Sequence, residues 1–188
     1  MNRGTGGDAS AELVGMESLG NLRVECYIRS DLSRVSERQV EVLLERLRAL
    51  RDTGLITDYE TRQWPPKRHT VVESQAAETT RSELFAKFEA WADQRGYSLA
   101  PAFERRTSHS SLLGNEEPRE EVRVPIVTLA LYDDATETTP LTGVVPYTEE
   151  PGTVERQTYT IDSWLCALED EAAPDNAVQV SSSARTEQ

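Results

Sequence analysis

The order strand, helix, strand in residues 22–64 constrains the fold more than any other feature of this chain. Residues 22–28 alternate apolar and polar side chains, which is the pattern of a half-buried strand. Residues 55–64, which end before Pro65-Pro66, predict a second strand. Because two parallel strands need a long crossover, usually a helix, this stretch of about 45 residues predicts a βαβ unit with a right-handed connection.

The connection between the two strands predicts a long helix. Ser36 and Gln39 have the spacing of a capping box at its start, and Gly54 offers the left-handed conformation that often ends a helix. Its apolar side chains recur at helical spacing and form a single stripe: Val40, Leu43, Leu44, Leu47 and Leu50.

The rest of the chain predicts two more helices and a hairpin. Thr80 and Glu83 form a second capping box, and Gly96 closes that helix. Residues 102–113 predict an irregular strand. The apolar run in residues 122–132 predicts a central strand buried on both faces, in which Pro125 marks either a bulge or the true start. Residues 141–147 return as its hairpin partner, and residues 161–169 predict a last helix, capped by Thr160.

We therefore predict one α+β domain over residues 19–171. Its leading topology is a ferredoxin-like βαβ unit followed by a helix, a β-hairpin and a C-terminal helix, and the alternative is a winged-helix-like arrangement. Residues 1–18 are rich in Gly, Ser and Glu, and we expect them and the tail of residues 172–188 to be disordered.

The charge balance indicates where such a protein works. Thirty-three Asp and Glu face eighteen Arg and two Lys, which gives a net charge of -13. Halophilic proteins use this excess of acid to stay soluble in a salt-saturated cytoplasm, where salt screens the self-repulsion. The alternative interpretation is an ordinary acidic protein from a GC-rich genome, in which codon bias replaces Lys by Arg.

No catalytic or cofactor motif stands out in the sequence, so we expect no enzyme activity, no catalytic residue and no cofactor. Cys26 and Cys166 lie far apart in apolar contexts and predict two buried thiols. With His69 and His109 they form no recognised metal-ligand spacing. Neither a signal peptide nor an apolar run long enough to span a membrane is present, so we expect a cytoplasmic protein without a membrane partner.

Five stretches carry a resemblance to a known family: LRVECYIRSDL, ERLRALRDTGLITDYETRQWP, VPIVTLALYD, LTGVVPY and YTIDSWLCALE. In this order they resemble a family of small acidic haloarchaeal proteins that are labelled as helix-turn-helix-domain proteins. The resemblance covers most of residues 22–169 and rests on residues that form the fold. The label implies DNA binding, but it names no site, so no binding residue carries over from it.

The outward face of the first helix alternates acidic and basic side chains, which is typical of a solvated, self-paired surface. Two basic patches, Lys67-Arg68-His69 and Arg105-Arg106 with His109, could contact phosphate if the fold brings them together, or could be charged surface loops. The candidate DNA-binding residues are Arg38, Arg62, Lys67, Arg68, Arg105 and Arg106.

The sequence thus leaves two functions open. The first is a DNA-associated transcriptional regulator. The alternative is a non-enzymatic small-molecule sensor or protein-interaction module with a ferredoxin-like sheet, which predicts a homodimer through an exposed sheet or helix face.

Overall fold

The computed structural model describes residues 13–65, 80–108, 119–149 and 156–172 of the chain. In these ranges the helices are the short 3-10 helix η1 (Met16–Ser18), α1 (Arg34–Asp52), α2 (Arg81–Arg95) and α3 (Ile161–Ala172). The strands are β1 (Leu22–Ile28), β2 (Asp58–Gln63), β3 (Tyr97–Ser98), β4 (Glu104–Ser108), β5 (Arg119–Arg123), β6 (Val127–Asp133), β7 (Leu141–Val145), β8 (Tyr147–Glu149) and β9 (Gln157–Tyr159).

The main sheet has the strand order β2-β1-β6-β7. β1 and β2 are parallel and joined by α1, with Val24 opposite Tyr59, while β6 pairs antiparallel with β1 on its other side. The predicted α+β class, the βαβ unit and the β6–β7 hairpin are confirmed. The ferredoxin-like arrangement is not confirmed, because its βαβ unit is split by an intervening strand, whereas β1 and β2 are direct neighbours.

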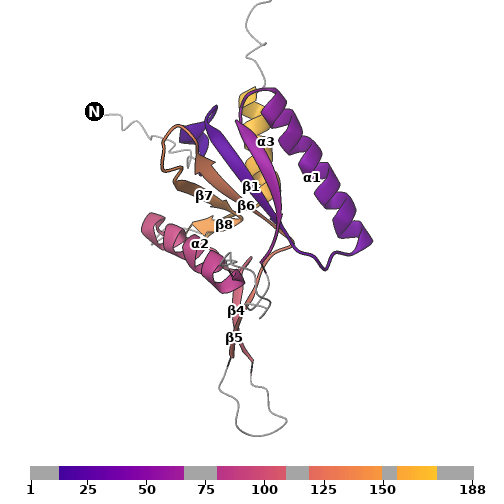
Figure 1. Ribbon diagram of the computed structural model, residues 1–188, viewed down its shortest axis with the longest axis vertical. Coiled ribbons are helices and arrows are strands. Elements are labelled where there is room, and N and C mark those ends of the chain that lie inside the picture. Colours follow the sequence, from indigo (N-terminus) through magenta and orange to yellow (C-terminus); the bar gives the residue numbers. More distant parts are fainter. Residues whose placement is uncertain (1–12, 66–79, 109–118, 150–155, 173–188) are drawn as a thin grey trace, which may run out of the picture.

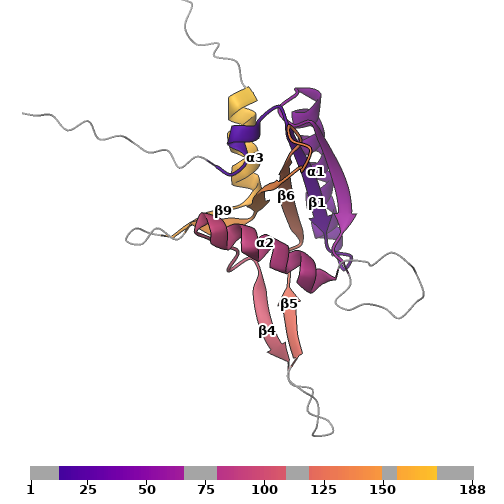
Figure 2. The same cartoon turned by 60° about the vertical axis from the view of Figure 1, so that its left-hand side comes forward.

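Helices cover both faces of the main sheet (Figures 1 and 2). α1 and α3 lie side by side on one face, and α2 crosses the other. Alternation along β1 directs Val24 and Cys26 to the α1 face and Tyr27 to the α2 face, where its ring meets Phe88 at 5.8 Å between centroids. Coverage on both sides explains why β1 and β6 are buried along almost their whole length.

The helix ends follow their capping residues. Thr80 and Glu83 form the predicted capping box of α2, and Gly96 closes that helix with a φ of 73°. The predicted start of α1 is wrong by about one turn, because the cap is Ser33, whose side chain accepts a hydrogen bond from the Ser36 backbone N–H at 3.2 Å. An extended Ser33 therefore lets the helix begin at Arg34.

The predicted strand over residues 122–132 is in fact two strands. β5 ends at Arg123 and pairs with β4, whereas β6 starts at Val127 and pairs with β1 and β7. Pro125 lies at the break, where its missing N–H is no loss to a ladder. The chain turns there, and the Ile126 carbonyl accepts a hydrogen bond from the Arg29 N–H at 3.0 Å. Pro125 therefore does not mark a bulge within one strand; it lies two residues before Val127, where the true strand β6 starts.

Two small sheets complete the domain. β3, β8 and β9 form one beside the end of β7, and β4 and β5 form a two-stranded ribbon. Figure 1 shows this ribbon projecting from the body of the molecule, beyond the end of α2. β4 lies within the irregular strand expected in residues 102–113, of which residues 109–113 are outside the described part of the chain.

The segment before residue 19, the predicted start of the domain, also packs against the main sheet and α3. Val14 is buried, and its carbonyl accepts a hydrogen bond from the Trp164 Nε1 at 3.0 Å. Val14 packs over Gly143, where an added Cβ would lie 2.7 Å from Leu131 and 3.1 Å from Val14. Close packing between β7 and the N-terminal segment thus explains a glycine in the middle of a strand.

Candidate functional site

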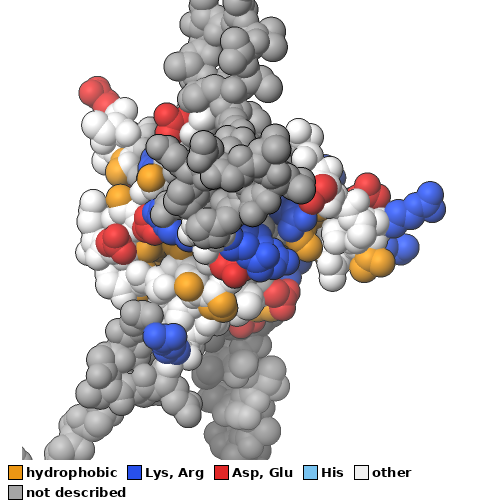
Figure 3. Space-filling view, turned by 90° about the horizontal axis from the view of Figure 1, so that it is seen from below, with side chains coloured by type: hydrophobic (Ala, Val, Ile, Leu, Met, Phe, Trp, Pro, Cys, Tyr) orange, Lys and Arg blue, Asp and Glu red, His pale blue; other side chains and the backbone are white. Residues whose placement is uncertain are grey.

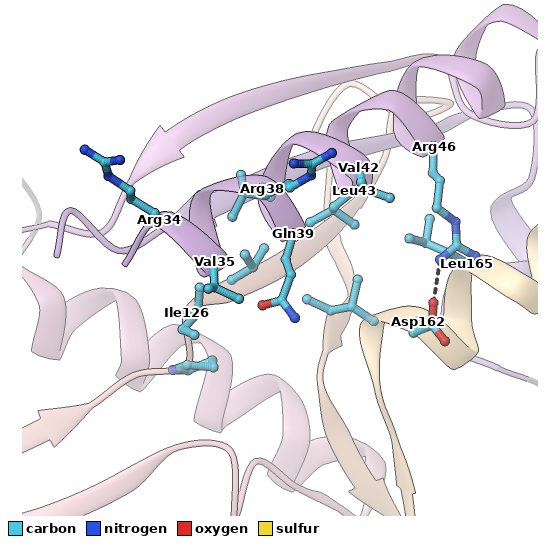
Figure 4. Close-up of a pocket in the computed structure, with 14 residues that line it drawn as sticks. Arg34, Val35, Arg38, Gln39, Val42, Leu43, Arg46, Ile126, Asp162 and Leu165 are labelled. Atoms are coloured by element: carbon cyan, nitrogen blue, oxygen red, sulfur yellow. Dashed lines mark hydrogen bonds and ion pairs between the residues drawn. The ribbon is translucent and has the colours of Figure 1, made fainter. Parts of the chain in front are cut away.

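An apolar groove runs along α1 (Figure 4). Its volume is about 930 Å³, and its walls are the outer side of α1, the connection at residues 125–127 and the first turns of α3. The exposed large hydrophobic side chains of the described ranges all line it: Val35 is 71% exposed, Val42 53% and Ile126 39%. Since exposed apolar surface that gathers in one place marks an interaction site, this groove is the first candidate.

Arginines form the rim of the groove. Arg46 is held by α3, because its Nε and Nη2 donate to the Glu169 carboxylate at 2.7 and 2.8 Å and its Nη1 donates to Asp162. Hydrogen bonding to Glu169 raises the pKa of Arg46 above its ordinary value. Arg34 and Arg38 are exposed and form no ion pair with any residue that the structure describes. These two charges remain available for a partner.

A second, polar pocket of about 690 Å³ lies on the other face of the sheet, between β1, β2, β6 and α2. At its base, Glu25 is only 6% exposed, and its carboxylate accepts hydrogen bonds from the Tyr27 hydroxyl at 2.7 Å and from Arg23 at 2.9 Å. Arg62 approaches the same carboxylate at 3.3 Å. Lys87, at the edge, donates to the Tyr132 hydroxyl at 3.2 Å.

This network fixes the protonation of its members. Burial works to raise the pKa of Glu25, but the hydrogen bonds from Tyr27 and Arg23 and the charge of Arg62 outweigh it and hold the pKa below its usual value. Burial and the neighbouring Glu25 raise the pKa of Tyr132 to about 12. The pocket therefore holds an ionised carboxylate and neutral phenols at neutral pH.

We expect Glu25→Gln to destabilise the fold by about 2 kcal/mol at pH 7, because a charged acceptor of two hydrogen bonds becomes neutral. A carboxyl whose pKa is lower in the folded than in the unfolded chain stabilises above its unfolded pKa, and the effect disappears as the pH falls through the folded pKa. The difference in the free energy of unfolding between wild type and variant should therefore shrink below about pH 4.5, the ordinary pKa of Glu. Urea denaturation at a series of pH values measures it, and a difference that is constant from pH 7 to pH 3 would contradict the assignment.

The predicted DNA-binding residues do not form one surface within the described ranges. Arg38 lies on the groove rim, and Arg62 lies in the polar pocket on the other face. Arg105 and Arg106 lie on β4, in the projecting ribbon. Lys67 and Arg68 lie outside the described residues, so their placement stays a prediction.

The ribbon arginines already have intramolecular partners. Arg105 pairs with Glu89 of α2 and stacks over the Phe85 ring, with its Cζ 5.2 Å from the centroid. Arg106 donates to Glu104 at 2.9 Å, and Glu104 lies opposite Arg123 on the neighbouring strand. Opposite charges therefore alternate on one ribbon face. All these pairs are exposed enough to exchange partners at small cost.

Figure 3 views the end of the molecule from which the ribbon projects. Lys and Arg side chains gather on this end, with Asp and Glu side chains among them. This end of the molecule is the second candidate surface.

Sequence reasoning missed the groove, although a signal for it exists. Val35 and Val42 are seven residues apart and fall outside the apolar stripe that faces the core, so α1 carries a second, shorter apolar line. The apolar run in residues 122–132 predicts that Ile126 belongs to a buried strand, but Ile126 lies in the turn after Pro125 and is exposed. The expected buried thiol of Cys166 is also wrong: Cys26 is buried, whereas Cys166 is exposed on α3.

Other kinds of site are not seen in the described part of the chain. Residues 13–65, 80–108, 119–149 and 156–172 contain no cluster of His, Cys, Asp and Glu side chains that could hold a metal ion. Over the same ranges, each helix is too short or too polar to cross a membrane. Each of α1, α2 and α3 is separated from the next by strands, so neither two helices joined by a short turn nor the winged-helix-like alternative is seen in these ranges.

Comparison with known proteins gives one result. The model of a protein family described as a helix-turn-helix domain matches residues 16–173. No curated protein and no solved structure matches the chain. Because the family match spans most of the sequence, the chain belongs to this family of helix-turn-helix domain proteins.

Proposed function

We propose that the protein is a DNA-associated transcriptional regulator of the salt-saturated cytoplasm of a haloarchaeon, without enzyme activity. The observation that carries this proposal is the family membership over residues 16–173, since helix-turn-helix domains are DNA-binding domains. Such regulators often bind two half-sites as dimers, and we propose a homodimer here as well.

The basic end of the molecule supports contact with the DNA backbone. A projecting two-stranded ribbon is an element that other proteins place in a DNA groove. Arg105 and Arg106 have side chains that are 48% and 57% exposed, so phosphate can replace their present carboxylate partners. The segment that carries Lys67 and Arg68 rejoins the described chain at Thr80, the cap of α2, which is also the helix that Arg105 contacts.

We expect that reversing the charges of the ribbon arginines and of the Lys67-Arg68 pair abolishes DNA binding. The test is crosslinking in a salt-adapted host, followed by sequencing of the DNA that co-purifies. Lys67→Glu with Arg68→Glu, and Arg105→Glu with Arg106→Glu, should each reduce enrichment at bound loci at least about tenfold. In vitro, losing two phosphate contacts should flatten the dependence of log K on log salt by about 1.8.

The matched control is Arg48→Glu with Arg51→Glu, a double charge reversal at exposed positions on α1 away from the ribbon. The control should leave DNA enrichment unchanged. The circular-dichroism spectrum in molar KCl should be the same for all variants and the wild type. Equal losses for the control and the ribbon variants would indicate a general effect of net charge. Background-level DNA for the folded wild type would remove the proposal.

The polar pocket favours a second candidate, a small-molecule sensor. Arg23 and Arg62 pair there with the buried carboxylate of Glu25, and Lys87 and Glu83 also line this volume of about 690 Å³. The lining thus holds three cations and two carboxylates, and an anionic ligand such as a phosphate or a carboxylate would complement the remaining positive charge. If DNA stays at background while inorganic phosphate raises the melting temperature of the wild type, the sensor replaces the DNA-associated regulator.

A further inference from the structure

We infer that the groove along α1 is the interface of a homodimer, in which the α1 helices of two copies pack antiparallel with Val42 at the two-fold axis. The inference rests on the proposed homodimer and specifies its surface. It needs no DNA, so its failure and the failure of DNA binding are separate results.

A line of apolar side chains on α1 carries the first step. Val35, Val42 and Ala49 are spaced seven residues apart, and all three are exposed. Side chains at this interval fall on one line along a helix and form the seam when two helices pair. The core-facing stripe, with Leu43, Leu47 and Leu50, is distinct from this line. α1 is therefore apolar on two sides, and the domain covers only one of them.

The shape of the groove suits a helix. It follows α1 from Arg34 to Arg46, which is about 18 Å at the rise of an α-helix. Ile126 and the first turns of α3 form the opposite wall (Figure 4). Three turns of a second helix could bury their apolar side against these walls, as in other helix-in-groove complexes.

A second copy of the chain is the occupant that the sequence favours. The terminal segments 1–12 and 173–188 offer only Met1, Val178 and Val180 as large apolar side chains, too few to fill the groove. A second α1 supplies the same Val35–Val42–Ala49 line. Because a two-fold interface uses the same patch on both copies, one exposed line is enough to build it.

Charge selects the antiparallel orientation. Arg38 precedes Val42 by four residues and Glu45 follows it by three, so both flank the apolar line on the same side of α1. Both are exposed, and neither has an ion-pair partner within the described ranges. A two-fold axis at Val42 reverses the second helix and brings Arg38 of each copy beside Glu45 of the other. A parallel two-fold pair would instead put Arg38 of one copy and Glu45 of the other on opposite sides of the apolar line, where they cannot pair. Arg38 is therefore assigned to the dimer interface.

Disulfide trapping tests the axis. In a Cys166→Ser background, Val42→Cys should form a disulfide-linked dimer on mild oxidation, because only a residue near the axis approaches its own copy within the roughly 7 Å between Cα atoms that a disulfide spans. Val35→Cys, which should face Ala49 of the second copy, should react at least about tenfold more slowly. Ala90→Cys, exposed on α2, is the control away from the groove.

A charge exchange tests the orientation. Arg38→Glu and Glu45→Arg should each raise the dimer Kd by about tenfold, and the double exchange should restore it to within about threefold of wild type. Light scattering without DNA, at the lowest salt that keeps the chain folded, gives the values. Restoration by the double exchange is a result that misfolding cannot produce.

Two outcomes would overturn the inference. One is a wild-type protein that stays strictly monomeric up to about 100 µM, a concentration at which even a weak dimer would form. This outcome includes the cases in which the groove binds another protein or one of the chain's own segments. The other is faster trapping at Val35→Cys than at Val42→Cys, which would indicate a different axis.

Discussion

Transfer of the protein from molar KCl to dilute buffer is expected to unfold it. Thirty-three acidic side chains face twenty basic ones, so thirteen negative charges have no cation to balance them, however the ion pairs are arranged. At 1 M salt the Debye length is about 3 Å, and their repulsion is screened; at 0.01 M it is about 30 Å, and repulsion acts across the whole domain. Loss of far-ultraviolet circular dichroism on dialysis, with recovery when KCl is returned, would establish this dependence.

A charge variant separates repulsion from other effects of salt. Glu37, Glu41, Asp93 and Glu171 are exposed side chains on the three long helices. Changing them to Gln or Asn removes four negative charges, and we expect the salt midpoint of unfolding to move to a lower concentration. Sucrose, which stabilises folded proteins without screening charge, should rescue the wild type less well than KCl. A melting temperature that does not change with salt would contradict the expectation and favour the codon-bias interpretation.

The local parts of the fold could be predicted because each has a local cause. The alternation in residues 22–28, the capping box at Thr80 and the left-handed Gly54 and Gly96 all depend on neighbours in the sequence. The break at Pro125 was harder, since the apolar run continues across it. The two strands separate there because they pair with different partners, β4 for one and β1 with β7 for the other. A local sequence pattern does not show which distant segments a strand pairs with.

The candidate surfaces were hidden for the same reason. Arg23, Glu25 and Tyr27 occupy the polar positions of an alternating strand, and alternation alone predicts that they face solvent. α2 packs over them and turns Glu25 into a buried carboxylate. Conversely, Val35 and Val42 are apolar residues on an amphipathic helix, and only the placement of α3 and the residue 125–127 connection leaves them exposed beside a groove.

Trp164→Ala is expected to produce the largest loss of stability among single core substitutions, about 3–5 kcal/mol. Trp164 is fully buried, and its Nε1 donates to the Val14 carbonyl at 3.0 Å. The substitution therefore opens a cavity and leaves a buried acceptor without its donor. Because folded domains are stable by only about 5–15 kcal/mol, the variant should be partly unfolded at salt concentrations at which the wild type is folded. Denaturant unfolding in molar KCl measures the difference.

Trp64 provides a matched comparison for the hydrogen bond. It is also buried, at 5% exposure, but its Nε1 has no hydrogen-bond partner in the described part of the chain. Changing either tryptophan to Phe removes a similar volume, yet only Trp164→Phe breaks a hydrogen bond. We expect Trp164→Phe to cost about 1–3 kcal/mol more than Trp64→Phe, since a buried acceptor is left unpaired in one case and a buried donor is removed in the other. Equal costs would show that the bond to Val14 adds nothing to the attachment of the N-terminal segment, and that the packing of α3 alone holds it.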